Sequence, residues 1–391
     1  MLLLFSLLFC FACAQEPSAL YLTFLHDPAT SMTIQWHSEK EGDSELLFGE
    51  AASSERRPAR GHSRRLPFLD LAIHTLELLS LKPDTLYSFH FPDNPDRSYT
   101  FRTLPQRLTR EVRFVVGGDA YFSFSLFHRM NQTVARLNPD FAVIGGDIAY
   151  TAGRLNFLKG KSDPLTRWLT FFHTVTADFT TPSGRIIPIV PVAGNHDVSK
   201  KERQQARGAL LFDFFAFPRQ TLSYRQLDLG NYASLLLLDT GHYAPIEGPQ
   251  TLWLEAALLS RKHLPYLFAA YHVAAYPSYY RFTSKTSTKV RSAWVPLFEQ
   301  YRLTAAFEHH NHTYKRTYPL LGGEPHPLGV PYLGDGSWGV PPRSPSLHPY
   351  LAKTEQDNAV WLVTLSPGAP ATATSYRING QPLETQKLTK K

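Results

Sequence analysis

Beyond residue 110, five short apolar runs each end in side chains that carry nitrogen or oxygen donor atoms. The clearest is the run from Phe141 to Ile144, which leads through two glycines to Asp147 and Tyr150. Glycine allows a sharp turn after a strand, and the carboxyl ends of parallel strands lie at one edge of an α/β sheet. We therefore expect an α/β domain in which the donors converge. The donors that follow the five runs are Asp119, Asp147 with Tyr150, Asn195 with His196 and Asp197, His272, and His310 with His312.

Taken alone, the segment from Gly145 to Tyr150 is better explained by a structural role than by metal binding or catalysis. An aspartate in a turn followed by a tyrosine in the core accounts for it, and short motifs of this kind also arise by chance. The repetition of donors after five separate runs reverses this interpretation, because core packing does not call for them. The pattern as a whole indicates one shared site.

The types of donor predict a pair of metal ions. Carboxylate, phenol and amide oxygens suit hard cations, and imidazole suits iron, zinc and manganese. Asp147 could bridge two ions about 3.5 to 4 Å apart. Tyr150 favours a strongly Lewis-acidic ion such as ferric iron, because the metal must remove the phenol proton. His310 and His312 alternate along the chain, so their rings are expected to point to different sides, one toward each ion.

The first fourteen residues have the features of an export signal. They are apolar and uncharged, and they end in the small-residue pattern Ala12-Cys13-Ala14. The segment is too short to span a bilayer, and no later apolar run reaches about 18 residues, so we expect an exported chain without a transmembrane helix. Both cysteines lie inside the segment, so the mature chain would hold its metals with N and O ligands. A lipid anchor on Cys13, which would make the protein a lipoprotein, is the alternative.

A change of sequence pattern near residue 105 divides the chain into two expected domains. Residues 17–104 contain short β-rich runs separated by Pro, Gly, Asp and Asn, which predict a sandwich of about seven strands without clustered donors. Residues 110–391 alternate strands with helical patterns and predict the α/β domain. Its helices are expected at residues 126–137, 165–172, 210–217 and 253–259.

The charge pattern favours a small anionic substrate. The formal net charge is +7, which suits an anion. The basic stretch from Arg56 to Arg65 contains Pro58 and Gly61 but no Phe, Tyr or Trp, so we predict a solvated loop rather than a nucleic-acid surface. No nucleic-acid partner is expected.

In order and spacing, the donor segments resemble the purple acid phosphatase family of binuclear metallophosphoesterases. That family carries five ordered blocks: DxG, GDxxY, GNHD or GNHE, a lone His after a strand, and GHxH. The second and third blocks are intact at residues 146–150 and 194–197, His272 supplies the lone histidine, and residues 309–312 read His-His-Asn-His. The resemblance implies an α/β sandwich of two mixed β-sheets flanked by helices, preceded by a fibronectin type III-like domain.

The resemblance also implies a role for each donor. A ferric site would be formed by Asp119, Asp147, Tyr150 and His312. A divalent site for Zn²⁺, Mn²⁺ or Fe²⁺ would be formed by Asp147, Asn195, His272 and His310. His196 and Asp197 are assigned to catalysis, with Asp197 acting from behind the ligands, and His196 and Asn195 are also assigned to substrate binding.

The activity implied is that of an acid phosphatase, which hydrolyses phosphomonoesters with a metal-bound hydroxide. One alternative is a phosphodiesterase or nucleotidase that uses the same metals. Another is a surface binding protein with weak catalysis, in which the metals are structural.

Three features depart from the family pattern. Tyr121 and His309 stand where the family has glycine, so both are expected to narrow the pocket. The family's further substrate-facing histidines have no counterpart in residues 274–282. Tyr279, Tyr280 or Arg281 could instead bind phosphate or an aromatic leaving group, and Arg281 is the one assigned to substrate binding, although all three are equally compatible with a surface location.

Overall fold

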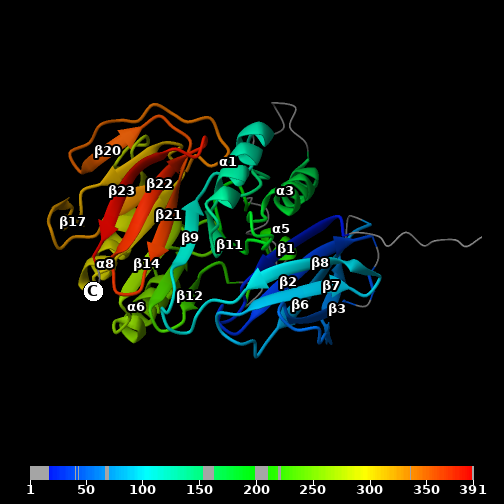
Figure 1. Ribbon diagram of the computed structural model, residues 1–391. Helices are drawn as coiled ribbons and strands as arrows, with labels where there is room; N and C mark the ends of the chain where they lie inside the picture. Colours follow the sequence, from blue (N-terminus) through cyan, green and yellow to red (C-terminus); the bar gives the residue numbers. More distant parts are fainter. Residues whose placement is uncertain are drawn as a thin grey trace, which may run out of the picture.

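The computed structural model describes residues 17–39, 41–42, 44–66, 70–152, 163–198, 210–218, 222–334 and 336–389. Figure 1 shows a small β domain, coloured blue to cyan, beside a larger domain that contains the rest of the chain. The segment predicted as an export signal lies outside the described residues. Among the described helices, none has the length and apolar character needed to cross a membrane.

The small domain is a sandwich of two antiparallel sheets. One sheet has the order β1 (Ala19–Thr23), β2 (Met32–Ser38), β6 (Ala72–Leu78) and β5 (His62–Arg65). The other has the order β4 (Arg57–Arg60), β3 (Glu45–Glu50), β7 (Leu86–Phe91) and β8 (Asn94–Arg102). Ile34, Leu76 and Phe89 are fully buried in the shared core. The predicted β-sandwich is therefore confirmed.

The arginine-rich stretch is not the solvated loop that the sequence predicts. Its two halves form the edge strands β4 and β5 of opposite sheets. Arg60 lies opposite Glu45 in the ladder and pairs with its carboxylate at 2.8 Å. Exposed charges on an edge strand discourage pairing with another chain, which explains why a charged segment can form a strand here.

The six-stranded sheet of the large domain is mixed. Its order is β11 (Ile189–Val192), β10 (Phe141–Gly145), β9 (Val112–Gly117), β21 (Ala359–Leu365), β22 (Ala371–Arg377) and β23 (Pro382–Leu388). β9, β10 and β11 are parallel neighbours, and β21 to β23 continue the sheet in antiparallel pairs. The segments that follow β9, β10 and β11 therefore leave the sheet at one edge.

The seven-stranded sheet is also mixed. Its order is β12 (Arg225–Leu229), β13 (Ala233–Leu238), β14 (Tyr266–Val273), β15 (Ala305–His309), β19 (Tyr332–Gly334), β16 (Tyr314–Thr317) and β20 (Leu351–Glu355). β13, β14, β15 and β19 are parallel, so β14 and β15 end at the same edge. A short hairpin of β17 (Leu320–Leu321) and β18 (Glu324–Pro325) follows β16.

The two large sheets pack face to face with helices outside. Phe114 on β9 stacks on Phe141 with the ring centroids 5.0 Å apart, and it meets Phe268 of the other sheet edge-on at 5.6 Å. The outer face of the first sheet is covered by α1 (Phe124–Arg136), α3 (Pro164–Asp178) and α5 (Leu210–Phe214). The second is covered by α6 (Pro249–Arg261), α7 (Lys285–Ala293) and α8 (Val295–Gln300). This architecture confirms the predicted fold class.

Capping residues explain where the first two helices begin. The Ser123 side chain accepts a hydrogen bond from Leu126 N–H at the start of α1. Asp163 caps α3 by accepting from two backbone N–H groups, and Pro164 occupies the first helical position. The helices predicted at 126–137 and 165–172 correspond to α1 and α3. The sequence did not predict α7, because its Thr and Ser residues weaken the helical pattern.

Aromatic side chains join the two domains. Tyr21 on β1 stacks on Phe172 of α3 with the ring centroids 4.1 Å apart, and His37 on β2 contacts Phe172 and Phe214 at 5.3 and 5.6 Å. All four side chains are buried. The small domain is therefore packed firmly against the outer helices of the large one.

Candidate metal centre

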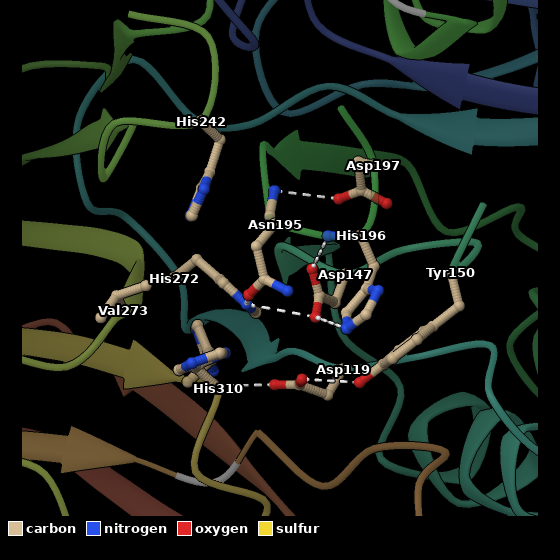
Figure 2. Close-up of polar contacts among 12 residues, drawn as sticks. Asp119, Asp147, Tyr150, Asn195, His196, Asp197, His242, His272, Val273 and His310 are labelled. Atoms are coloured by element: carbon tan, nitrogen blue, oxygen red, sulfur yellow. Dashed lines mark hydrogen bonds and ion pairs between the residues drawn. The ribbon is translucent and has the colours of Figure 1, made fainter. Parts of the chain in front are cut away.

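The predicted donors converge where the two large sheets meet. Asp119, Asp147 and Asn195 follow β9, β10 and β11, and His272 and His310 come from the ends of β14 and β15. Figure 2 shows the labelled donors pointing toward one another from both sheets. The parallel strands thus bring together residues that are almost two hundred positions apart in the sequence.

The backbone at the site is held in an uncommon conformation. Five of the predicted ligands have a positive φ, which non-glycine residues rarely adopt and which the surrounding structure must enforce. The angles lie between 52° and 71° for Asp119, Asp147, Tyr150, His310 and His312. Clustering of such residues at one place is typical of a functional site.

Glycines allow the donor loops to approach closely. Gly146 has φ of 90°, and a Cβ atom there would lie 2.6 Å from Nδ1 of His272. A Cβ on Gly194 would lie 2.0 Å from the backbone nitrogen of Asp147. The glycines of the sequence blocks are therefore needed because the loops and the histidine occupy the space that a side chain would fill.

One group of donors is formed by Asp119, Tyr150 and His312. The Tyr150 hydroxyl donates a hydrogen bond of 2.7 Å to Oδ1 of Asp119 and lies 3.2 Å from Nε2 of His312. The same Asp119 oxygen lies 2.9 Å from Nε2 of His312. Three donor atoms thus meet at one point, as expected of ligands to a common ion.

A second group surrounds Asp147. Its Oδ2 atom lies 3.3 Å from Nε2 of His272, and that nitrogen lies 3.0 Å from Oδ1 of Asn195. One donor atom each from Asp147, His272 and His310 all lie within 4.8 Å of one another. The other His272 nitrogen, Nδ1, is 3.0 Å from the Gly145 carbonyl oxygen, which orients the ring.

His196 and Asp197 occupy different positions. His196 stacks on Tyr150, and its Nε2 atom faces the donors at 3.9 Å from Oδ2 of Asp147. Asp197 is fully buried and accepts hydrogen bonds from the backbone N–H groups of Ile148 at 2.7 Å and Gly194 at 2.9 Å. His196 therefore borders the space in which a ligand would lie, whereas Asp197 ties together the loops that carry Asp147 and Asn195.

A further observation indicates that these donor residues are suited to binding metal ions. Oδ2 of Asp147 is buried, and apart from the ion-pair contact with His272 at 3.3 Å no group in the described part of the chain forms a hydrogen bond with it. A buried carboxylate oxygen without such a partner carries a substantial free-energy penalty, which a cation would remove. The donor set around it comprises carboxylate, phenol, amide and imidazole groups, which are the kinds of ligand that would hold metal ions.

The pKa values show how strongly the donors interact. Burial disfavours ionisation of Asp147, but the nearby charges of His272, His196 and His310 outweigh it and hold the pKa well below its usual range. Burial also disfavours the charged form of His272, yet Asp147 and Asp119 raise its pKa to about 9. The pKa of His310 falls to about 3 through burial and the neighbouring His272. Without a metal ion, the positive charge of protonated His272 therefore partly neutralises the Asp147 carboxylate, as a bound cation would do.

Tyr121 and His309 do not lie over the donors. The Tyr121 ring meets Phe127 at 5.5 Å and lies 4.8 Å from the Arg167 guanidinium. The His309 ring is buried against Gly145, where an added Cβ atom would be 1.9 Å from it. Both rings pack behind the site, so this placement does not support the expectation that they narrow the pocket.

The tyrosine before Arg281, rather than Arg281 itself, contacts a predicted ligand. Arg281 is exposed in the turn before α7. Tyr280 stacks on His310 with the ring centroids 4.7 Å apart and an angle of 20°. A cavity of about 260 Å³ opens beside this stack, with Asn195, His242 and Lys285 among its lining residues.

Sequence reasoning missed Arg343, which donates a hydrogen bond of 2.8 Å to the Tyr280 hydroxyl. It lies in a proline-rich stretch that carries no periodic pattern, so no local signal marks it. The sequence also did not predict that Lys315 pairs with the buried Glu308 beneath the histidines.

Comparison with protein families agrees with this site. Residues 17–103 match the family described as Purple acid Phosphatase, N-terminal domain, and residues 112–314, or 203 of 391, match Calcineurin-like phosphoesterase. The chain belongs to the purple acid phosphatase family. It is thus a member of a phosphoesterase hydrolase family, and all seven ligand positions implied by the resemblance lie at one place in the fold.

Individual relatives are distant. Purple acid phosphatase 13 of Arabidopsis thaliana is 23% identical over 299 residues, covering 68% of this chain and 54% of that protein. Phosphoenolpyruvate phosphatase of Allium cepa is 24% identical over 334 residues, covering 78% and 64%. A protein of Mycobacterium tuberculosis without an assigned function is 25% identical over 362 residues, covering 79% and 64%. This chain therefore spans less than two thirds of the length of these three relatives.

Solved structures show the same fold. Purple acid phosphatase PPD1 from yellow lupin seeds superposes with a TM-score of 0.76 at 15% identity, over 95% of this chain and 74% of that one. GAP50, the anchor in the inner membrane complex of Plasmodium, superposes with a TM-score of 0.52 at 14% identity, over 72% and 90%. At these identities the comparison establishes the fold of the purple acid phosphatase family and not a shared substrate.

Proposed function

We propose that the protein is an exported, binuclear metal-dependent phosphatase that hydrolyses phosphomonoesters. The observation that carries this proposal is the position of Asp147. Its carboxylate lies between two groups of donors, and its Oδ2 atom is buried without a hydrogen-bond partner among the described residues. The relative named phosphoenolpyruvate phosphatase supports a monoester as the class of substrate.

We assign one metal to Asp119, Asp147, Tyr150 and His312, and the other to Asp147, Asn195, His272 and His310. The phenol of Tyr150 favours ferric iron at the first position, and the neutral donors favour Zn²⁺, Mn²⁺ or Fe²⁺ at the second. When bound, the metals supply Lewis acidity and activate water for attack on phosphorus.

His196 is placed to act on the leaving group. Its Nδ1 atom lies 2.5 Å from the Ala152 carbonyl oxygen, which can only accept, so Nδ1 carries a proton. Nε2 then faces the donors, where it can accept a proton and donate it to a phosphoryl oxygen or to the departing alkoxide. The stack with Tyr150 holds the ring in this orientation.

Asn195 and Asp197 support the same chemistry. The Asn195 Oδ1 atom points to His272, so the amide nitrogen of Asn195 remains a donor for a phosphoryl oxygen. Asp197 acts through the loops that it joins and is assigned a positioning role.

Export rests on the apolar, uncharged segment at residues 1–14. We expect cleavage after Ala14, with a lipid anchor on Cys13 as the alternative. Mass spectrometry of the amino terminus from native cells distinguishes the two, since a lipid adds mass and cleavage leaves Gln15 as the first residue.

The test uses purified protein from metal-supplemented culture. We expect about two metal ions per chain and hydrolysis of an aryl phosphate. Asp147→Ala should lose both metals and turnover, while Asp96→Ala, which removes an exposed carboxylate of the small domain, should retain them. Absence of metals from the wild-type protein, or full activity of Asp147→Ala, would refute the proposal.

Substrate comparison separates the remaining alternatives. The same metals could serve a phosphodiesterase or nucleotidase, so aryl phosphate, bis-aryl phosphate and a nucleotide should be compared at equal concentration. A protein that binds both metals but hydrolyses none of them across pH would instead be a binding protein, a role consistent with the anchor function named for the Plasmodium structure.

A further inference from the structure

We propose that Arg343 binds the phosphoryl group of the substrate and replaces the substrate-facing histidines that residues 274–282 lack. This inference rests on the proposed function, because it names a residue that contacts the same substrate. It also makes a prediction about phosphate binding that can be tested without turnover.

The backbone fixes Arg343 next to a predicted metal ligand. The Arg343 N–H donates a hydrogen bond of 2.7 Å to the carbonyl oxygen of His312. Three residues further on, the Ser346 N–H donates one of 2.6 Å to the carbonyl oxygen of Ser278. These two hydrogen bonds join the proline-rich loop to the segment that carries His312 and to the segment that carries Ser278.

The side chain is held on the side of His310. Nη1 of Arg343 donates to the Tyr280 hydroxyl at 2.8 Å, and the Tyr280 ring stacks on His310. The guanidinium carbon lies 4.8 Å from the centre of the Tyr279 ring and 5.3 Å from that of Tyr280. Aromatic contacts of this kind orient a guanidinium without neutralising its charge.

The charge of Arg343 is available to a ligand. Within the described part of the chain no carboxylate pairs with it, and its one side-chain hydrogen bond to a protein group, with Tyr280, uses one of five N–H donors. The side chain is partly exposed. A planar guanidinium with free N–H groups is well suited to phosphate, because two parallel hydrogen bonds can form.

The experiment measures binding of inorganic phosphate to metal-loaded protein by isothermal titration calorimetry. Arg343→Ala should weaken binding by about 10- to 100-fold, as expected for loss of a hydrogen bond between charged groups. Metal content should not change. Arg343→Lys keeps the positive charge but lacks the planar set of N–H groups that can form two parallel hydrogen bonds, so it should lose less phosphate affinity than Arg343→Ala. Tyr280→Phe, which removes the hydroxyl that holds Nη1, should also weaken binding.

The matched control is Arg129→Ala, which removes an exposed arginine of α1. It should bind phosphate like the wild-type protein. With an aryl phosphate, Arg343→Ala should raise KM in proportion to the weaker phosphate binding.

The inference is overturned if Arg343→Ala and Arg343→Lys, with both metals bound, retain the wild-type phosphate affinity. If Arg343→Ala fails to fold, Arg343→Lys and Tyr280→Phe decide the question by the same measurement. A wild-type protein that binds phosphate through Arg343 but hydrolyses no ester would refute the proposed function while supporting this inference.

Discussion

The Tyr150 hydroxyl donates a hydrogen bond of 2.7 Å to Asp119, and Tyr150 as a whole residue is 98% buried. Burial and the two nearby carboxylates raise the pKa of the phenol well above its usual value, so solvent does not remove its proton near neutral pH. Only a strongly Lewis-acidic ion would do so. We therefore expect the iron-loaded protein to absorb visible light and Tyr150→Phe to lose that absorption.

The spectrum should be recorded together with iron content. Tyr121→Phe, which changes a tyrosine that packs toward α1, should keep the visible band. A visible band of wild-type strength in Tyr150→Phe would show that the phenol is not a ligand of iron.

Asp197 should affect activity through the loops that it joins. The Asp197 carboxylate accepts hydrogen bonds from the backbone N–H groups of Ile148 and Gly194. In Asp197→Asn, an NH₂ group would face one of these two N–H groups, and two donors cannot form a hydrogen bond. The displaced loop would misplace Asp147 or Asn195. We expect metal affinity or kcat to fall by about 10- to 100-fold, the usual effect of losing a group that supports metal ligands.

Metal titration and steady-state kinetics check this prediction. Asp96→Asn, which makes the same chemical change at an exposed position, should match the wild-type protein. Unchanged metal affinity and kcat in Asp197→Asn would contradict the positioning role.

Gly145 and His309 should be energetically coupled. A Cβ atom on Gly145 would lie 1.9 Å from the buried His309 ring. Gly145→Ala should therefore destabilise the fold by about 1 to 3 kcal/mol through overpacking. The cost of the same alanine should be smaller in a His309→Gly background, because the ring is then absent. Denaturant unfolding of the four proteins in the double-mutant cycle measures this coupling, and additive effects would contradict it.

The sequence predicted the site better than its surroundings. The strands that carry Asp119, Asp147 and His272 are continuous apolar runs, and their donors follow at the strand ends, so both features are local in sequence. The two-sheet sandwich followed from the resemblance and is confirmed by the structure. The edge strands β4 and β5 were missed because charged side chains on an exposed edge look like a loop.

Contacts between distant segments had no local signal. Glu308 is fully buried, accepts a hydrogen bond of 2.6 Å from the Tyr271 hydroxyl and pairs with Lys315. The sequence shows only two charged residues near the histidines. Likewise, the position of Arg343 beside Tyr280 depends on a loop that crosses to another part of the domain. Such arrangements require the tertiary structure.

His37 should make the protein sensitive to acid. It is 99% buried at the junction of the domains, and burial together with the charge of His74 lowers its pKa to about 3. The unfolded chain has the ordinary value of about 6.5. Between these values the unfolded state binds a proton that the folded state does not, so the free energy of unfolding falls as the pH is lowered.

The contribution of His37 should be complete above pH 6.5 and should be lost progressively toward pH 3, by up to about 1.4 kcal/mol for each pH unit. Thermal unfolding of wild-type protein and His37→Gln should be followed across this range. The variant, although less stable at pH 7 through lost packing, should show a weaker dependence of Tm on pH. His62→Gln, at an exposed position on β5, should keep the wild-type dependence. Equal pH dependence in His37→Gln and the wild-type protein would show that the buried imidazole does not limit stability in acid.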